Sequence, residues 1–138
     1  MYISVVTRRN VRRDAKNRCG YCQSHQQYLL SRLEVEHIIP SSKGGSDDES
    51  NLWLACRRCN NHKSAKIDAV DPTSGQRVAL FNPRMQTWSD HFRWSDSGTY
   101  VIGLTSTGRA TINALELNES HAVAVRRNWV QVGWHPPT

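Results

Sequence analysis

The chain has 138 residues, of which 38% are hydrophobic, and its mean hydropathy is −0.63. This length suits one compact domain, or a small domain with an extension, rather than two independent cores. No apolar run approaches the roughly 18 residues that a membrane span requires, which excludes a membrane-spanning protein. The short apolar N-terminus precedes Arg8 and Arg9 instead of following them. Because a secretory signal has the opposite order, we expect an intracellular, cytoplasmic protein.

Positive charge is concentrated in the first half of the chain. The formal net charge is +6, of which residues 1–70 account for +5 and residues 71–138 for +1. Such an excess favours a polyanionic partner, and nucleic acid is the commonest polyanion in a cell. A solvated basic surface without such a partner is the alternative that charge alone leaves open.

Residues 7–18 are predicted to form a short helix that begins near Thr7, with Thr or Asn as its cap. The segment carries six positive charges and one negative charge. This composition is typical of a helix that contacts phosphate groups, which adds affinity without sequence preference.

The four cysteines form two Cys-x-x-Cys pairs. In a chain without a secretory signal this arrangement favours thiolate metal ligands over disulfides, and no βαβ unit is evident that would hold a thioredoxin-type redox pair. Four thiolates suit a tetrahedral zinc ion. We therefore predict a structural zinc, bound by Cys19, Cys22, Cys56 and Cys59.

A polar pair, Glu36 and His37, lies midway between the two cysteine pairs. Alternating residues over 33–38 predict a short strand with His37 on one face and Glu36 on the other, and Pro40 ends it. The segment 41–50 is rich in Gly, Ser and Asp and is expected to be a loop. The zinc ion would thus hold the two ends of a segment that carries a reactive pair.

The second cysteine pair leads into a predicted helix at about 60–68. Helical spacing would place Asn60 and Lys63 on one face and His62 on another. These side chains, with Glu36 and His37, supply the imidazole, oxygen donors and ammonium group that phosphodiester hydrolysis needs.

Turn residues at 71–75 indicate a boundary between a cysteine module, residues 1–70, and an extension, residues 71–138. The extension is expected to form a β-meander with strands at 78–81, 99–104 and 110–115, followed by a helix from about 119 to 130. Its aromatic residues Trp88, Phe92 and Trp94 are expected to pack this small sheet onto the module.

Six sequence elements resemble the HNH endonucleases, which have a ββα-metal active site and a four-cysteine zinc frame. The elements are Cys19-x-x-Cys22, Glu36-His37-Ile-Ile-Pro40, Gly44-Gly45, Asn51-Leu, Cys56-x-x-Cys59-Asn60 and Lys63. They occur in the family's order and cover about residues 16–66. The resemblance implies an α+β fold, in which a zinc-stapled ββα-metal module is followed by a small β-rich extension.

The resemblance also implies roles for single residues. His37 matches the family's general base, which takes a proton from the attacking water. Glu36 matches a ligand of the catalytic divalent metal, and Asn51 matches the residue that orients the base by tying its loop. Asn60 matches the second metal ligand, with His62 as the alternative.

Further expectations concern the cofactors and the substrate. Lys63 is expected to contact phosphate or the transition state. Because the expected donors are mostly oxygen atoms, Mg²⁺ or Mn²⁺ suits the catalytic site better than a second zinc. Two groups of arginines, one in the first helix and one in the second cysteine pair, are candidate DNA contacts, although the second group could equally be solvated: Arg8, Arg9, Arg12, Arg13, Arg57 and Arg58.

Two functions follow from these residues. The first is a metal-dependent endonuclease that hydrolyses phosphodiester bonds in DNA, with double-stranded DNA as the expected partner, and an RNA nuclease would use the same site. The second is a zinc-ribbon-like module that binds nucleic acid without cutting it. The acid and imidazole pair at Glu36 and His37 favours the first, because a protein that only binds has no need of it.

Overall fold

The computed structural model describes residues 3–138 and contains two compact units. The first consists of Met1–Ile67 and Asn82–Thr87, and the second of Asp68–Phe81 and Trp88–Thr138. Both combine helices with short antiparallel strands, so the fold class is α+β. Over the residues described, every helix is too short or too polar to cross a lipid bilayer.

The first unit opens with α1 (Val5–Asp14). Ser4 caps the helix, because its side chain accepts a hydrogen bond from the Thr7 backbone at 3.1 Å. The helix ends earlier than the sequence indicated, at Asp14 instead of residue 18. Lys16 and Asn17 have φ angles of 56° and 55°, and a right-handed helix cannot include such angles.

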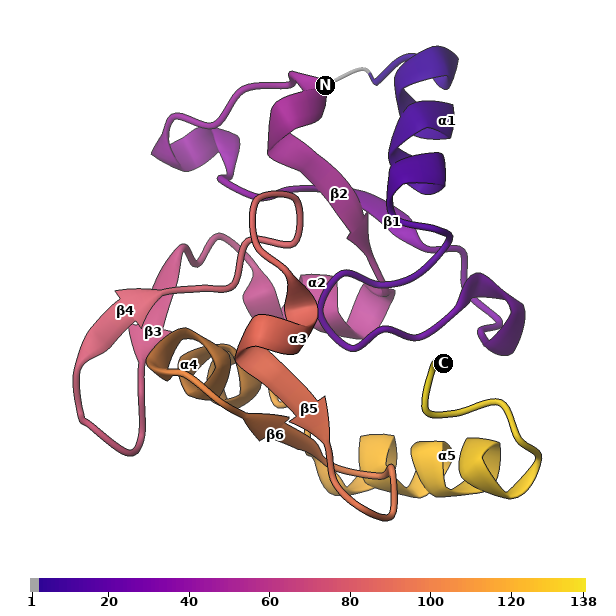
Figure 1. Ribbon diagram of the computed structural model, residues 1–138. Helices are drawn as coiled ribbons and strands as arrows, with labels where there is room; N and C mark the ends of the chain where they lie inside the picture. The colour runs from indigo at the N-terminus through magenta and orange to yellow at the C-terminus, as the bar shows by residue number, and fades with distance from the viewer. Residues whose placement is uncertain (1–2) are drawn as a thin grey trace. The chain divides into compact units, whose positions relative to one another are not determined.

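A two-stranded antiparallel sheet forms the centre of this unit. β1 (Glu34–His37) pairs with β2 (Leu52–Ala55), so that Glu36 lies opposite Trp53 and His37 opposite Leu52. As Figure 1 shows, α1 lies against this sheet at one end, and α2 (Arg57–Lys63) lies near the other end of β2. Three single turns of 3₁₀ helix occur in the connections: η1 (Gln26–Tyr28), η2 (Ser41–Lys43) and η3 (Glu49–Asn51).

The segment Asn82–Thr87 returns to the first unit after the chain has entered the second. Arg84 Nε donates to the Leu52 carbonyl at 3.1 Å, and its guanidinium lies 4.9 Å from the centre of the Trp53 ring. Trp53 and Pro83 also close over Gly20, where a Cβ atom would lie 2.4 Å from the indole ring. Trp53 therefore packs against the Asn82–Thr87 segment and the first cysteine pair.

The second unit contains two hairpins and three helices. β3 (Asp68–Val70) pairs with β4 (Arg77–Ala79), and β5 (Phe92–Trp94) pairs with β6 (Val101–Gly103). The helices are α3 (Trp88–His91), α4 (Ser106–Leu115) and α5 (Ser120–Gln131). Asp71, fully buried after β3, accepts two hydrogen bonds from Arg109 of α4, at 3.0 and 2.9 Å. This ion pair ties the first hairpin to the helix.

The strand expected at 110–115 is wrong, because these residues belong to α4. Thr105 caps the helix by accepting from the Gly108 backbone. Gly108 also allows close approach, since a Cβ there would lie 2.1 Å from the His91 carbonyl oxygen. The cap and this contact extend a helix over residues whose side chains alone resemble a strand. The final helix, α5, lies within two residues of its expected limits.

Candidate active site and metal centre

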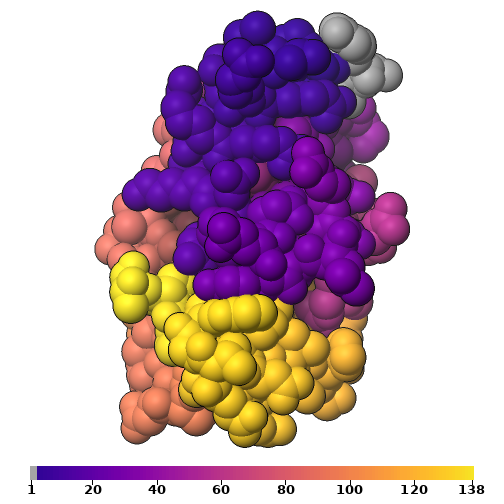
Figure 2. All heavy atoms as spheres, turned by 90° about the vertical axis from the view of Figure 1, so that its right-hand side faces the viewer, coloured from indigo at the N-terminus to yellow at the C-terminus, as the bar shows by residue number. Residues whose placement is uncertain are grey.

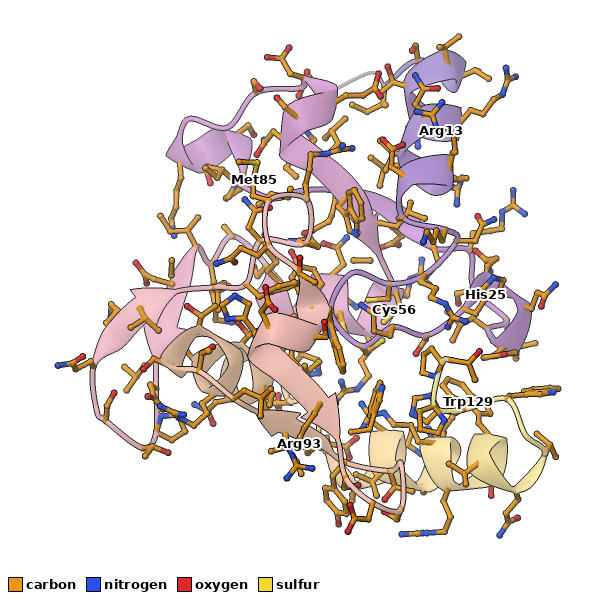
Figure 3. The ribbon with its side chains drawn as sticks, viewed as in Figure 1. Arg13, His25, Cys56, Met85, Arg93 and Trp129 are labelled. Carbon is orange, nitrogen blue, oxygen red and sulfur yellow. The ribbon has the colours of Figure 1, made fainter. Side chains whose placement is uncertain are left out.

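The four cysteines converge in the first unit, and all are buried. Their Sγ atoms all lie within 4.8 Å of one another, and Cys22 Sγ is 3.7 Å from Cys56 Sγ. Zinc–sulfur bonds of about 2.3 Å in a tetrahedron separate sulfur atoms by about 3.8 Å, whereas a disulfide bond is about 2.05 Å long. Burial raises the pKa of the Cys19 thiol, so thiolates in this interior need a cation. The four cysteines therefore fit a zinc ion, as the sequence indicated; Cys56 is labelled in Figure 3.

Glu36 points into the protein and is 3% exposed. One carboxylate oxygen accepts a hydrogen bond from the hydroxyl of Tyr21, which lies between the first two cysteines. The other oxygen is 3.3 Å from Nζ of Lys63. Burial raises the pKa of Glu36, although both partners stabilise its charged form. Tyr21, Glu36 and Lys63 form a buried network that links the cysteine cluster to β1.

Lys63 extends this network to the backbone beside His37. Its Nζ donates to the carbonyl of His37 at 3.1 Å and to that of Ile38 at 2.9 Å. The side chain is 2% exposed, so the ammonium group does not face solvent. In this geometry Lys63 holds the end of β1, whereas the sequence indicated a contact with phosphate.

His37 lies at the end of β1, with 14% of its side chain exposed. Its Nε2 is 2.9 Å from Oδ1 of Asp47, whose side chain is 54% exposed. When Nε2 carries the proton, it donates to Asp47. Nδ1 then has no proton and can accept one. The carboxylate also stabilises the imidazolium that forms when Nδ1 takes up a proton.

Asn51 closes the loop that joins His37 to Asp47. Its Oδ1 accepts from the Ile39 backbone at 2.9 Å, and its Nδ2 donates to the carbonyls of Ile39 and Ser46 at 2.9 and 2.8 Å. Gly45 allows this closure, because a Cβ there would lie 1.7 Å from the Ile39 carbonyl oxygen. The amide of Asn51 thus fixes both ends of the loop.

Other side chains engage the residues that were expected to hold a catalytic metal. Glu36 faces Tyr21 and Lys63, whereas Nδ2 of Asn60 donates to Glu34 Oε1 at 2.9 Å. His62 joins no group of three His, Cys, Asp or Glu side chains that could hold a metal within residues 3–138; the four cysteines are the one such group. A divalent cation on Glu36 would also lie beside the ammonium of Lys63, and like charges repel. In this arrangement the Glu36 carboxylate is paired with Lys63 in the place where a divalent cation was expected.

The arginines expected to bind DNA fall into two sets. Arg8 and Arg12 of α1 and Arg57 of α2 line one open groove. Arg13 projects outward from α1 (Figure 3), is 69% exposed, and pairs with Asp14 at 3.0 Å. Arg9 and Arg58 do not line the groove either, whereas Arg32, which precedes β1, does.

Comparison with known proteins gives a family match over the residues that contain the cysteine cluster and the His37 loop. The family model described as HNH endonuclease matches residues 19–66. These residues form an HNH domain. The Septu protein PtuB of Bacillus mycoides (strain KBAB4) is 28% identical over 106 residues, with 59% of this chain and 36% of that protein covered. The chain thus spans about a third of the length of this curated relative. No solved structure gives a significant match.

The HNH domain begins at Cys19 and ends within four residues of Lys63, so it contains the cysteine cluster, the buried network and the His37 loop. Sequence reasoning missed two partners in these sites, Tyr21 and Asp47. Asp47 is the first of three consecutive acidic residues, so the sequence marks a negatively charged segment there. Only its tertiary position distinguishes it from Asp48. Nothing in the sequence marks Tyr21 as a partner of Glu36.

Proposed function

We propose that this chain is a DNA endonuclease that hydrolyses phosphodiester bonds, with His37 as its general base. The HNH family is a family of nucleases, which supports the class of reaction. The observation that carries the proposal is the pair of His37, at the end of β1, and Asp47, in the following loop that Asn51 ties at both ends. A protein that only binds nucleic acid does not need an imidazole oriented in this way.

The proposed reaction is the addition of water to a phosphodiester. Nδ1 of His37 accepts a proton from the water, whose oxygen forms a bond to phosphorus as the bond to the leaving oxygen breaks. Asp47 stabilises the imidazolium that results, and the leaving oxygen takes a proton from solvent. Lys63 and Asn51 are positioning residues, because both bind the backbone at residues 37–39.

HNH nucleases use divalent metals, and the sequence indicated Mg²⁺ or Mn²⁺ on Glu36 and Asn60. In this proposal both residues position the helix against β1, through Lys63 and Glu34 respectively. No divalent cation is placed on them. The structural zinc has a separate role, because it joins the two segments that flank β1 and β2.

One observation favours a second function, a zinc-containing module that binds nucleic acid without cutting it. The expected metal ligands have different partners, because Glu36 pairs with Lys63 and the Asn60 side chain donates to Glu34. This alternative retains the cysteine cluster and the arginines and gives His37 no chemical role.

Incubation of purified protein with supercoiled plasmid separates the two functions. The buffer contains Mg²⁺ or Mn²⁺, because HNH nucleases use divalent metals, and a parallel sample contains RNA of matched length. The endonuclease predicts conversion of plasmid to nicked or linear forms. Plasmid that is bound and stays supercoiled at every metal concentration contradicts the proposal and supports the second function.

A further inference from the structure

An open groove of about 780 Å³ lies in the first unit. Three segments supply its lining: Arg8 and Arg12 from α1, Ser31 to Val35 from the entry to β1 and its first half, and Arg57 and Asn60 from α2. Figure 2 shows α1, in indigo, beside the violet chain that leads to β1, and Arg12 joins the two by donating to the Leu33 carbonyl at 3.2 Å. Within the described residues β1 pairs only with β2, so it is an edge strand.

The groove gathers positive charge. Four of its nine lining residues are arginines, and Glu34 is the one carboxylate among them. Glu34 is already engaged, because it accepts from Asn60 at 2.9 Å and lies 3.6 Å from Nε of Arg57. Burial lowers the pKa of Arg12, and the positive charges of Arg32 and Arg8 lower it further. Like charges held this close destabilise the free protein, and an anion in the groove would relieve their repulsion.

We propose that this groove binds the phosphodiester backbone of a nucleic-acid strand through Arg8, Arg12, Arg32 and Arg57. Guanidinium groups match phosphate in charge and geometry. Among the described residues, none of those that line the groove is aromatic, so they offer no platform on which bases could stack. The contacts are therefore to the backbone, and they confer affinity without reading sequence.

The groove and His37 share one strand. Glu34 and Val35 line the groove, and His37 is the last residue of the same strand. At about 3.3 Å per residue, His37 lies about 10 Å along β1 from Glu34. A backbone held in the groove would thus place a nearby phosphodiester within reach of His37, and this part of the inference rests on the proposed function.

Binding measured as a function of salt tests the groove. The protein carries His37→Ala and the buffer contains no divalent metal, so that cleavage plays no part. The probes are labelled 20-base-pair duplexes of DNA and of RNA. Each phosphate contact contributes about 0.9 to the slope of log affinity against log salt concentration. Arg32→Gln with Arg57→Gln is expected to lower the steepness of that slope by about 1.8.

The control is Arg9→Gln with Arg13→Gln, which removes the same charge from α1 outside the groove. A control that flattens the slope as much as the groove variant overturns the proposal, as does a groove variant with the parent slope or a parent that binds neither probe. If the groove variant melts well below its parent, Arg8→Gln replaces it, with an expected change of about 0.9.

The two probes identify the source of the phosphate. Loss of slope with DNA alone, with RNA alone or with both supports the groove and assigns its strand. The result is also independent of the reaction. A groove that binds as described in a protein that never cuts plasmid keeps this inference and refutes the proposed endonuclease.

Discussion

Lys63→Met tests the buried network directly, because it removes the ammonium group and keeps much of the side-chain volume. Lys63 and Glu36 are each 2% exposed in their side chains, and their charged atoms are 3.3 Å apart. Removing one partner of such a buried pair costs about 3–5 kcal/mol, because the other charge stays buried and uncompensated. For a domain of this size that loss lowers the melting temperature by at least about 12 °C.

Calorimetry of the zinc-loaded protein measures this change, with the transition of the first unit identified as the one that zinc addition shifts. Lys66→Met is the matched control, because Lys66 is exposed and lies three residues after the end of α2; it should shift melting by less than about 4 °C. Glu36→Gln combined with Lys63→Met should lower the melting temperature by less than the sum of the two single losses. The reason is that the double variant leaves neither charge buried alone. Additive losses, or a Lys63→Met variant that melts like the control, would refute the network.

The pH dependence of Lys63→Met follows from Glu36. Burial already raises the pKa of this carboxyl, and Lys63 opposes that rise, so the variant has a pKa higher still. A group with a raised folded-state pKa contributes stability that is present below its unfolded pKa, about 4.3, and lost as pH rises through the folded value. Lys63→Met should therefore be less destabilised near pH 5 than at pH 8.

Three further predictions concern other parts of the chain. Zinc removal by a chelator should abolish the calorimetric transition of the first unit, since structural zinc contributes about 10–16 kcal/mol in small zinc domains; an unchanged transition would contradict a zinc role in folding. Asn51→Ala should reduce plasmid cleavage about tenfold or more and make backbone amides of the 39–46 loop exchange hydrogen faster, whereas a variant that cuts normally would separate the loop from the chemistry. Asp71→Asn should destabilise the second unit at pH 7, and the destabilisation should shrink as the pH falls from 4 to 2. The Arg109 pair holds the pKa of Asp71 well below its usual range, so its contribution is present above the unfolded pKa of about 3.9 and is lost as pH falls through the folded value; a pH-independent difference would contradict this.

The cysteine cluster and the facing of Glu36 and His37 could be predicted from the sequence. Two Cys-x-x-Cys pairs constrain a tetrahedral site by spacing alone, and alternation on β1 placed Glu36 and His37 on opposite faces. Helical spacing likewise placed Asn60 and Lys63 together, and both do face β1 in the structure. These features depend on local backbone geometry, which can be predicted from residue spacing along the chain.

The partners of those side chains could not be predicted in the same way. The family resemblance assigned Glu36 and Asn60 to one metal, but whether Glu36 meets Asn60 or Lys63 depends on how α2 docks against β1. A Lys chain can reach a buried carboxylate and two carbonyl groups at once, and no local pattern indicates this. The sequence prediction also missed Arg32 as a groove residue, because the groove is defined by how α1 and α2 dock against β1.

The secondary structure of the second unit shows the same limit. Residues 110–115 alternate in a way that indicates a strand, yet the cap at Thr105 and the close approach at Gly108 place them in α4. β5 was missed because its three residues, Phe92 to Trp94, are too few to give a period. Short elements form here through pairing and packing, which a single sequence does not display.

The proposed endonuclease activity depends most on His37 as the base. Its direct test is the plasmid cleavage rate of His37→Ala, with zinc content, melting temperature and DNA affinity measured on the same preparation. His121→Ala, the same change at an exposed position of α5, is the control. We predict a loss of about 100-fold or more in rate for His37→Ala, with zinc, melting and affinity unchanged and the control fully active. A His37→Ala protein that still cuts plasmid at the parental rate would contradict the account.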